Sequence, residues 1–164
     1  MNDNIVIDLD ESVSKIIDNV DLKEKIEKIV YLALEEEKIN VNKVFVSIEA
    51  VSKEEIRDIN RQYRNVDKET DVLSFPIFTK EELQKISCDD DQKKLNEIEL
   101  GDIILCNDVI REHAKEYGTG LYRETLYMIT HAMFHLLGYD HEVEEEKKIM
   151  RTKEEVVLSQ IGEI

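Results

Sequence analysis

The sequence has 164 residues, of which 38 are Asp or Glu and 22 are Lys or Arg, so its formal net charge is −16. A chain of this length is sufficient for one domain with its own hydrophobic core, and we expect a single domain spanning residues 1–164. The negative charge excludes a uniformly basic coat for nucleic acid and a general attraction to an anionic membrane surface. A local basic patch is not excluded.

Nothing in the sequence predicts export or insertion into a membrane. Residues 1–11 lack the cationic start and apolar stretch of a secretory signal. No apolar run approaches the roughly 18 residues that a membrane-spanning helix needs. Cys88 and Cys106 form no metal-spaced cluster and are expected to be reduced thiols. We therefore expect a cytoplasmic protein with no membrane partner.

The apolar residues of the chain predict short strands that alternate with helices. Period-two alternation is typical of a half-buried strand, whereas spacings of three and four residues are typical of an amphipathic helix. In chain order, the predicted elements are a strand at Asn4–Leu9, a helix at about 22–34, a strand at Val44–Ala50, a helix from Ser52 to about Arg64, a strand at Asp71–Phe75, a strand at Leu100–Cys106, a helix from Asn107 to about Tyr117, a buried helix at Leu121–Leu137 and a surface helix beyond His141. The charged, weakly patterned segment 77–99 is expected to be an exposed excursion, partly helical around 81–86. This alternation predicts a small mixed sheet covered by helices.

The most informative segment is Thr130–Glu142, THAMFHLLGYDHE, which holds three of the four histidines. His131 and His135 are four residues apart on the buried helix, so both imidazoles lie on one face and can bind one ion. Gly138 permits a turn after the helix, and His141 can then supply a third nitrogen. Three imidazoles with an open fourth position are typical of a catalytic zinc site. The sequence predicts one Zn²⁺ held by three histidines and water, although imidazole also accepts other divalent transition metals.

Two other interpretations of these histidines stay open from the residues alone. His131 and His135 could be separate core residues, but burying two imidazoles without partners would cost several kcal/mol. The spacing HxxxHxxGxxH also matches the metzincin proteases, which carry a glutamate base directly after the first histidine. Ala132 occupies that position here, so zinc proteolysis lacks its general base. His113, on a charged helix, is interpreted as a solvated side chain.

A stripe of positive charge follows the helix that starts at Ser52. It consists of Lys53, Arg57, Arg61 and Arg64, which recur at helical spacing. A solvated, salt-bridged face is the simpler interpretation for Lys53 and Arg57. Arg64 differs because it stands at the end of the helix before a turn, where a guanidinium can hold phosphate oxygens in a fixed fork. A phosphodiester substrate would explain such a stripe in an acidic protein.

Three segments of the chain form a recognisable set of motifs. They are Tyr63–Pro76 (YRNVDKETDVLSFP), Leu100–Cys106 (LGDIILC) and His131–His141 (HAMFHLLGYDH). In sequence, order and separation they resemble the YbeY family, bacterial endoribonucleases of ribosomal RNA maturation. The resemblance implies an α+β, zincin-like fold, with about five helices around a four-stranded mixed sheet and the metal-binding helix at the centre.

The resemblance also implies site residues and partners. The family's three metal-binding histidines match His131, His135 and His141, and its functionally important arginine matches Arg64. The implied partners are ribosomal RNA or a ribosomal subunit, and ribosome-associated proteins. The implied role is processing of the 3′ end of small-subunit ribosomal RNA and ribosome quality control.

Two positions depart from the family's usual pattern. Ala132 replaces the glycine that commonly follows the first histidine, a change of one methyl group. Asp71 stands where relatives often have asparagine, so a polar contact made there can differ in charge.

The sequence thus favours a single-strand-acting, metal-dependent endoribonuclease. Zinc would activate bound water or polarise a phosphoryl oxygen as a Lewis acid, and Arg64 would stabilise the negative charge of the transition state. The nucleophile is either a zinc-bound hydroxide or the RNA's own 2′-hydroxyl. Asp140 is a candidate to orient an imidazole, or serves only the turn after the helix. The alternative function is a non-catalytic ribosome assembly factor in which the metal chiefly stabilises the fold.

Overall fold

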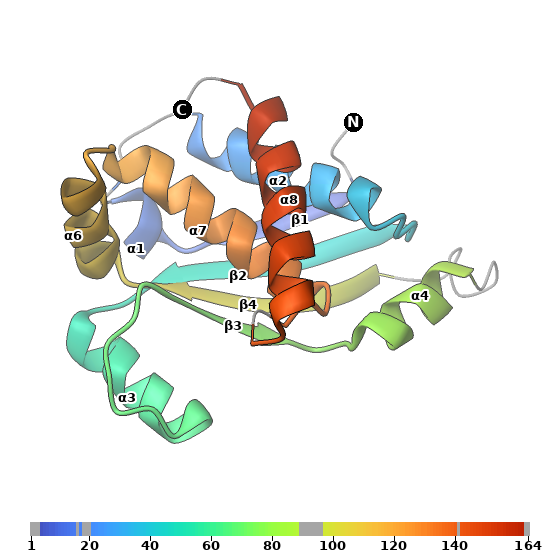
Figure 1. The fold of residues 1–164 in the computed structure, drawn as a ribbon. Helices are drawn as coiled ribbons and strands as arrows, with labels where there is room; N and C mark the ends of the chain where they lie inside the picture. The colour runs from blue at the N-terminus through green and yellow to red at the C-terminus, as the bar shows by residue number, and fades with distance from the viewer. Residues whose placement is uncertain (1–3, 16, 18–20, 89–96, 141, 163–164) are drawn as a thin grey trace.

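A computed structural model describes residues 4–15, 17, 21–88, 97–140 and 142–162 (Figure 1). Strands and helices alternate along this part of the chain. In chain order, the elements are β1 (Ile5–Leu9), α1 (Glu11–Ser14), α2 (Leu22–Glu36), β2 (Lys43–Ala50), α3 (Lys53–Arg64), β3 (Val72–Pro76), α4 (Lys80–Cys88), β4 (Glu97–Leu105), α6 (Asn107–Tyr117), α7 (Leu121–Leu136) and α8 (Glu144–Gln160).

The four described strands form one sheet in the order β1-β2-β4-β3. The first three strands in this order are parallel, and β3 pairs antiparallel with β4 at the edge. This edge position suits Pro76 at the end of β3, because proline donates no hydrogen bond to a neighbouring strand. The predicted α+β class and four-stranded mixed sheet are confirmed.

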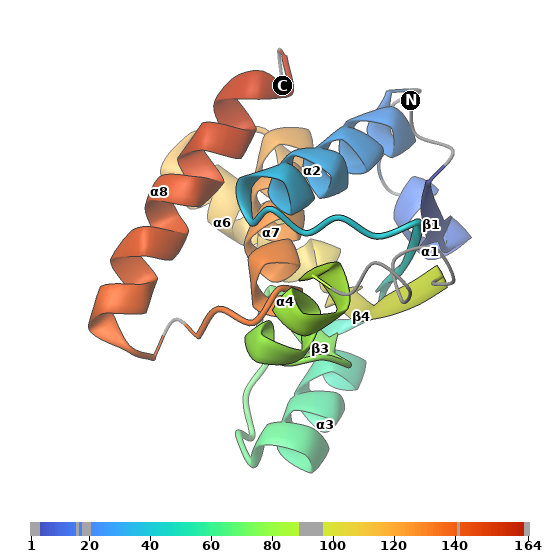
Figure 2. The same cartoon turned by 90° about the vertical axis from the view of Figure 1, so that its right-hand side faces the viewer.

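Helices cover the two faces of the sheet unequally. Figures 1 and 2 show α2, α7 and α8 over one face, whereas α3 lies on the opposite side near β3. The central helix is α7, which contacts α2, α6, α8 and β3. Residues from almost the whole circumference of α7 are buried, as its apolar sequence predicts. No described helix is long and apolar enough to cross a membrane.

Two predictions about the helices were wrong. About five helices were expected, but the described residues form seven. The helix expected around 81–86 is present as α4, but the segment 77–99 is not simply an exposed excursion, because Leu83 of α4 is fully buried and β4 begins at Glu97. The Ser87 hydroxyl also accepts a hydrogen bond from the Asn40 N–H and donates one to the Lys38 carbonyl, which holds α4 against the turn before β2. The acidic residues 89–91 lie outside the described residues.

Gly101 allows β3 and β4 to approach closely. Its φ is +142°, and a Cβ at this position would lie 2.2 Å from the carbonyl oxygen of Phe75 on β3. The pairing of β4 with β2 shifts register here, so that Leu100 forms a bulge between the paired residues Glu99 and Gly101. Leu100 is fully buried. In the LGD sequence, Leu100 is therefore a buried bulge residue, and any other residue in place of Gly101 would require β3 to move.

We expect Gly101→Ala to lower the free energy of unfolding by at least about 2 kcal/mol, because the backbone conformation and the contact with β3 both oppose a side chain. Urea unfolding followed by circular dichroism measures this change. Gly120→Ala is the matched control, since Gly120 has a φ of −93° and no atom within 4 Å of its added Cβ. Its stability should stay within about 1 kcal/mol of the wild type. Equal stability of the two variants would contradict this role of Gly101.

Candidate active site

His131 and His135 lie one turn apart on α7, and the structure brings their rings together. Their Nε2 atoms are 3.1 Å apart, and the ring centroids are 4.6 Å apart with an interplanar angle of 87°. Both residues are partly exposed, although the helix around them is mostly buried. The helical spacing therefore produces two imidazoles that converge on one point at the surface of the core.

The other nitrogen of each ring faces a fixed acceptor. His131 Nδ1 lies 2.8 Å from Glu154 Oε2, and His135 Nδ1 lies 2.7 Å from the carbonyl oxygen of Tyr139. Because a carboxylate and a carbonyl only accept hydrogen bonds, we assign the proton of each neutral ring to Nδ1 and the lone pair to Nε2. Two lone pairs directed at one point are the donor arrangement that a transition-metal ion requires. The described donors therefore fit Zn²⁺.

Glu154 is the site residue that the sequence interpretation missed. It is only 3% exposed and lies on the core face of α8, together with Met150 and Val157. A buried carboxylate is costly without a hydrogen-bonding partner, and the imidazole of His131 supplies one. The signal was present in the sequence, since Glu154 follows Met150 by four residues and precedes Val157 by three on one helical face. Because most of the residues around Glu154 in the sequence are charged, this spacing was not recognised as a sign of burial.

The turn after α7 is fixed by contacts on both sides. Gly138 has a φ of +101°, and a Cβ there would lie 2.8 Å from the backbone nitrogen of Lys80 on α4. The next residue, Tyr139, holds His135 through its carbonyl, and its ring lies 3.8 Å from the Lys80 Nζ, measured to the ring centroid. Burial raises the pKa of the Tyr139 hydroxyl, and its hydrogen bond to Glu37 raises this pKa further. These contacts fix the carbonyl that orients His135.

Of the other two predicted site residues in this segment, His141 and Asp140, the structure describes only Asp140. His141 lies outside the described residues, so its role as third ligand stays a prediction. The described residues include no group of three or more His, Cys, Asp or Glu side chains that could hold a metal. Asp140 is exposed, and its Oδ1 accepts the Glu142 N–H at 2.9 Å, which closes the turn after α7. The two described imidazoles take their Nδ1 partners elsewhere, so an orienting role of Asp140 is restricted to His141.

A groove of about 330 Å³ joins the two histidines to the end of α3. Its lining includes Arg64, Thr70, Asp71, Ser74, His131 and His135. Arg64 is the last residue of α3, and Asn65 ends the helix in the left-handed conformation, with a φ of 58°. The neighbouring Tyr63 packs edge-on against Phe75 of β3, with ring centroids 5.4 Å apart. The fold therefore brings Arg64 and the histidine pair to one groove, although Arg64 and His131 are 67 residues apart in the sequence.

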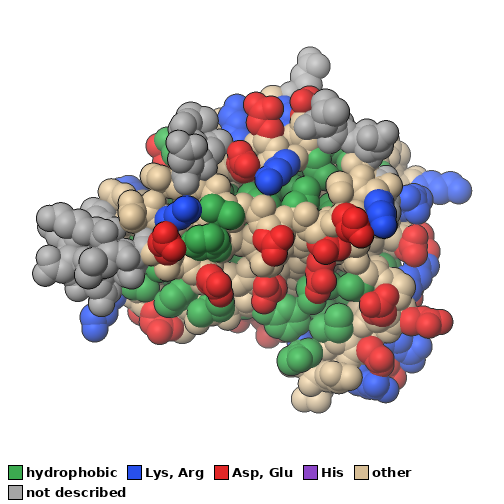
Figure 3. Space-filling view, turned by 180° about the vertical axis from the view of Figure 1, so that it is seen from behind, with side chains coloured by type: hydrophobic (Ala, Val, Ile, Leu, Met, Phe, Trp, Pro, Cys, Tyr) green, Lys and Arg blue, Asp and Glu red, His purple; other side chains and the backbone are tan. Residues whose placement is uncertain are grey.

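Arg64 differs from the other cations of α3 in its partners. Figure 3 shows acidic side chains spread over the back of the molecule, with Lys and Arg side chains interspersed among them. The ion pairs are Lys53 with Glu112, Arg57 with Asp67 at 2.8 Å and Arg61 with Asp58 at 2.6 Å. Among the described residues, Arg64 has no ion-pair partner, and it lines the groove. Its guanidinium is therefore available to an anionic ligand.

Comparison with known proteins assigns the chain to a family. Residues 7–162 match the family model described as endoribonuclease YbeY. The chain belongs to the YbeY family. It is 42% identical over 150 residues to endoribonuclease YbeY of Thermoanaerobacter sp. strain X514, covering 89% of this chain and 91% of that relative. It is 41% identical over 160 residues to endoribonuclease YbeY of Clostridium botulinum strain Kyoto, covering 93% and 96% of the two chains.

A solved structure agrees with this assignment to the YbeY family. The solution structure of TM1509 from Thermotoga maritima is similar to this chain with a TM-score of 0.59 and 30% sequence identity. The similarity covers 96% of this chain and 88% of that protein. The resemblance inferred from the three motif segments is confirmed.

We expect Glu154→Gln to weaken zinc binding about 10- to 100-fold, because the amide removes the negative charge that orients His131 and raises its basicity. Competition between the protein and a chromogenic zinc chelator measures the affinity. Glu155→Gln is the matched control, since Glu155 is the next residue of α8 and is exposed. Zinc affinity equal to wild type in the Glu154→Gln protein would contradict the positioning role.

Proposed function

We propose that this YbeY-family chain is a metal-dependent endoribonuclease that cleaves single-stranded segments of ribosomal RNA. The observation that carries the proposal is the groove, where an arginine with no ion-pair partner among the described residues and two converging imidazoles line one surface. Such a groove offers a charged fork for a phosphate beside a metal site. As in the family, the cleavage would mature the 3′ end of small-subunit ribosomal RNA and support ribosome quality control.

We infer that His131, His135 and His141 bind one Zn²⁺. The support is the pair of Nδ1 hydrogen bonds, which directs the Nε2 lone pairs of the two described rings toward one another. When bound, zinc supplies Lewis-acid polarisation of a phosphoryl oxygen. Glu154 and the Tyr139 carbonyl keep both rings in the orientation that binding requires, without rearrangement at the moment of reaction.

Arg64 binds and orients the phosphodiester in this proposal. Its planar guanidinium donates two parallel hydrogen bonds to phosphate oxygens, which fixes the direction of the phosphate as well as its position. The same donors become stronger as negative charge grows on those oxygens in the pentacoordinate transition state. The packing of Tyr63 on Phe75 and the Asn65 cap hold the end of α3 in place for this contact.

The architecture and the surroundings of the site are part of the proposal. Residues 1–164 would form a single zincin-like domain, with α7 as the central helix that carries two metal ligands. The family match and the relatives, which cover about nine-tenths of both chains, support this extent. The partners would be a ribosomal subunit and ribosome-associated proteins in the cytoplasm.

Arg64→Ala is expected to lower kcat/KM for a single-stranded oligoribonucleotide about 10²- to 10³-fold, because it removes donors that act in the transition state. The melting temperature and bound zinc should stay at wild-type values, since Arg64 is exposed and lies on α3 rather than on α7 or α8. A gel assay on an oligonucleotide with the sequence of the small-subunit 3′ end measures the rate.

Two further variants control the Arg64 experiment. Arg61→Ala removes an exposed arginine of the same helix that pairs with Asp58, and it should retain cleavage. His131→Ala should abolish cleavage. Equal cleavage by the wild type and by His131→Ala would identify a contaminating nuclease and overturn the proposed function.

RNA binding should weaken as salt rises, because each phosphate contact releases a counterion. For single strands, log K falls by about 0.7 per phosphate contact for each unit of log salt concentration. Arg64→Ala should therefore flatten the slope by about 0.7, whereas Arg61→Ala should leave it unchanged. Fluorescence anisotropy with a 2′-O-methyl oligonucleotide, which resists cleavage, measures this slope. A flat wild-type response would count against phosphate recognition.

A further inference from the structure

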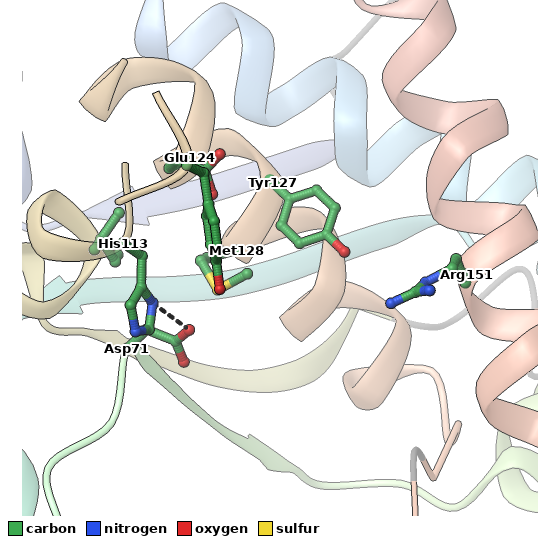
Figure 4. Close-up of a pocket in the computed structure, with 8 residues that line it drawn as sticks. Asp71, His113, Glu124, Tyr127, Met128 and Arg151 are labelled. Carbon is green, nitrogen blue, oxygen red and sulfur yellow. Dashed lines mark ion pairs between the residues drawn. The ribbon is translucent and has the colours of Figure 1, made fainter. Parts of the chain in front are cut away.

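A second cavity, of about 420 Å³, shares Asp71 with the groove. Its volume falls within the roughly 300–1,000 Å³ range that is typical of small-molecule pockets. Figure 4 shows side chains from three helices and from the residue before β3 around it: His113 from α6, Glu124, Tyr127 and Met128 from α7, Arg151 from α8, and Asp71. The cavity thus adjoins the proposed site of cleavage, but no step of the proposed reaction uses it.

The cavity combines hydrogen-bond acceptors, donors and apolar surface. Asp71 and Glu124 provide carboxylate oxygens, and Arg151 provides a guanidinium. Within the part of the chain that the structure describes, Arg151 makes no ion pair. Tyr127 and Met128 contribute a half-buried ring and a thioether, and in Figure 4 the Tyr127 hydroxyl and Arg151 point toward one another. Flat apolar surface edged by donors and acceptors suits an aromatic heterocycle.

The two carboxylates are held in place by hydrogen bonds. Asp71 Oδ1 accepts the Val72 N–H at 2.8 Å, and its Oδ2 lies 3.4 Å from His113 Nδ1 (Figure 4). Glu124 Oε1 accepts the hydroxyl of Thr119 at 2.7 Å. Each carboxylate can accept about four hydrogen bonds, so both retain lone pairs for a ligand. Acceptors that are already ordered lose less entropy when a ligand binds.

We propose that this cavity binds an unstacked guanine of the RNA strand, next to the phosphodiester that lies in the groove. The proposal rests on the proposed endoribonuclease function. Guanine presents adjacent N1–H and N2–H donors to a carboxylate and adjacent O6 and N7 acceptors to an arginine. Uracil offers one ring N–H and no amino group, and adenine and cytosine lack guanine's paired donors. Single-stranded RNA is commonly recognised through bases that stack on aromatic side chains and hydrogen-bond at their edges.

Nucleotide binding to the zinc-loaded full chain tests this subsite directly. GMP and UMP carry the same phosphate, so a difference in their affinity reports the base. NMR titration with ¹³C-labelled methionine methyl groups should show GMP shifting the Met128 resonance and binding at least about tenfold more tightly than UMP. Arg151→Met should reduce this preference to about twofold or less. Arg111→Met is the matched control, because Arg111 is an exposed arginine of α6 that pairs with Asp108, and it should keep the preference.

Cleavage of oligoribonucleotides that differ in one base beside the cleaved bond tests the consequence for the reaction. Replacing guanine by uracil should lower kcat/KM at least about tenfold for the wild type, and about twofold or less for Arg151→Met. The zinc content and melting temperature of Arg151→Met should stay at wild-type values, because Arg151 is exposed. Such a result assigns Arg151 to base selection rather than to the chemical step.

The outcomes separate this inference from the proposed function. Cleavage by the wild type without base preference, or equal binding of GMP and UMP, overturns the guanine subsite and leaves the endoribonuclease proposal intact. Preferential GMP binding at Met128 with no cleavage of any RNA supports the subsite and overturns the endoribonuclease proposal. Loss of the preference in Arg111→Met as well as in Arg151→Met overturns the assignment of Arg151.

Discussion

The hydrogen bonds that His131 and His135 make through Nδ1 are the constraint on which the proposed site depends. One bond joins α7 to a carboxylate of α8, and the other joins α7 to the carbonyl of Tyr139 in the turn that follows it. Rotation of the His131 ring would leave Glu154, which is 3% exposed, without its partner, and an unsatisfied buried charge is costly. The packing of α7 against α8 therefore sets the direction of His131 Nε2, and the turn after α7 sets that of His135 Nε2. In the proposed metal site, the contacts of the folded chain therefore orient both rings before an ion binds.

Local charge, rather than net charge, explains how this acidic protein can present a site for an anion. The net charge of −16 describes the whole surface, but exposed charges more than about 8–10 Å apart are largely screened at physiological salt. Carboxylates pair with the other cations of α3, Asp58 from the same helix and Asp67 and Glu112 from other segments, which leaves Arg64 at the helix end beside the groove. The carbonyl end of the helix dipole also favours a cation at that place. Arg64 can therefore act as an isolated positive charge at one position on an acidic surface.

Secondary structure, which depends on residues close together in the chain, was predictable from the sequence. Contacts between side chains of different elements were not. Hydrophobic periodicity located all four strands of the sheet and placed the limits of α3 and α7 within one residue of those observed. It indicated the helix around 81–86 but not its burial, since Leu83 of α4 belongs to the main hydrophobic core. It assigned no role to Glu154, and it interpreted His113 as solvated, although His113 Nδ1 lies 3.4 Å from Asp71 Oδ2. In each case the partner that changes the side chain's role lies on another element. The local pattern could place Glu154 on the core face of its helix, but it could not reveal which side chain lies opposite.

Asp71 shows how one such contact links the two cavities. A carboxylate beside the proposed phosphate site would repel a phosphate unless its own charge were offset. In this chain the imidazole of His113 lies 3.4 Å from Asp71 Oδ2, while the Val72 N–H and the Thr70 hydroxyl donate to Oδ1. These donors face both oxygens of the carboxylate and offset its charge locally. Since Asp71 lines both the groove and the neighbouring cavity, this one ordered carboxylate lies between the proposed sites for the phosphate and for the base.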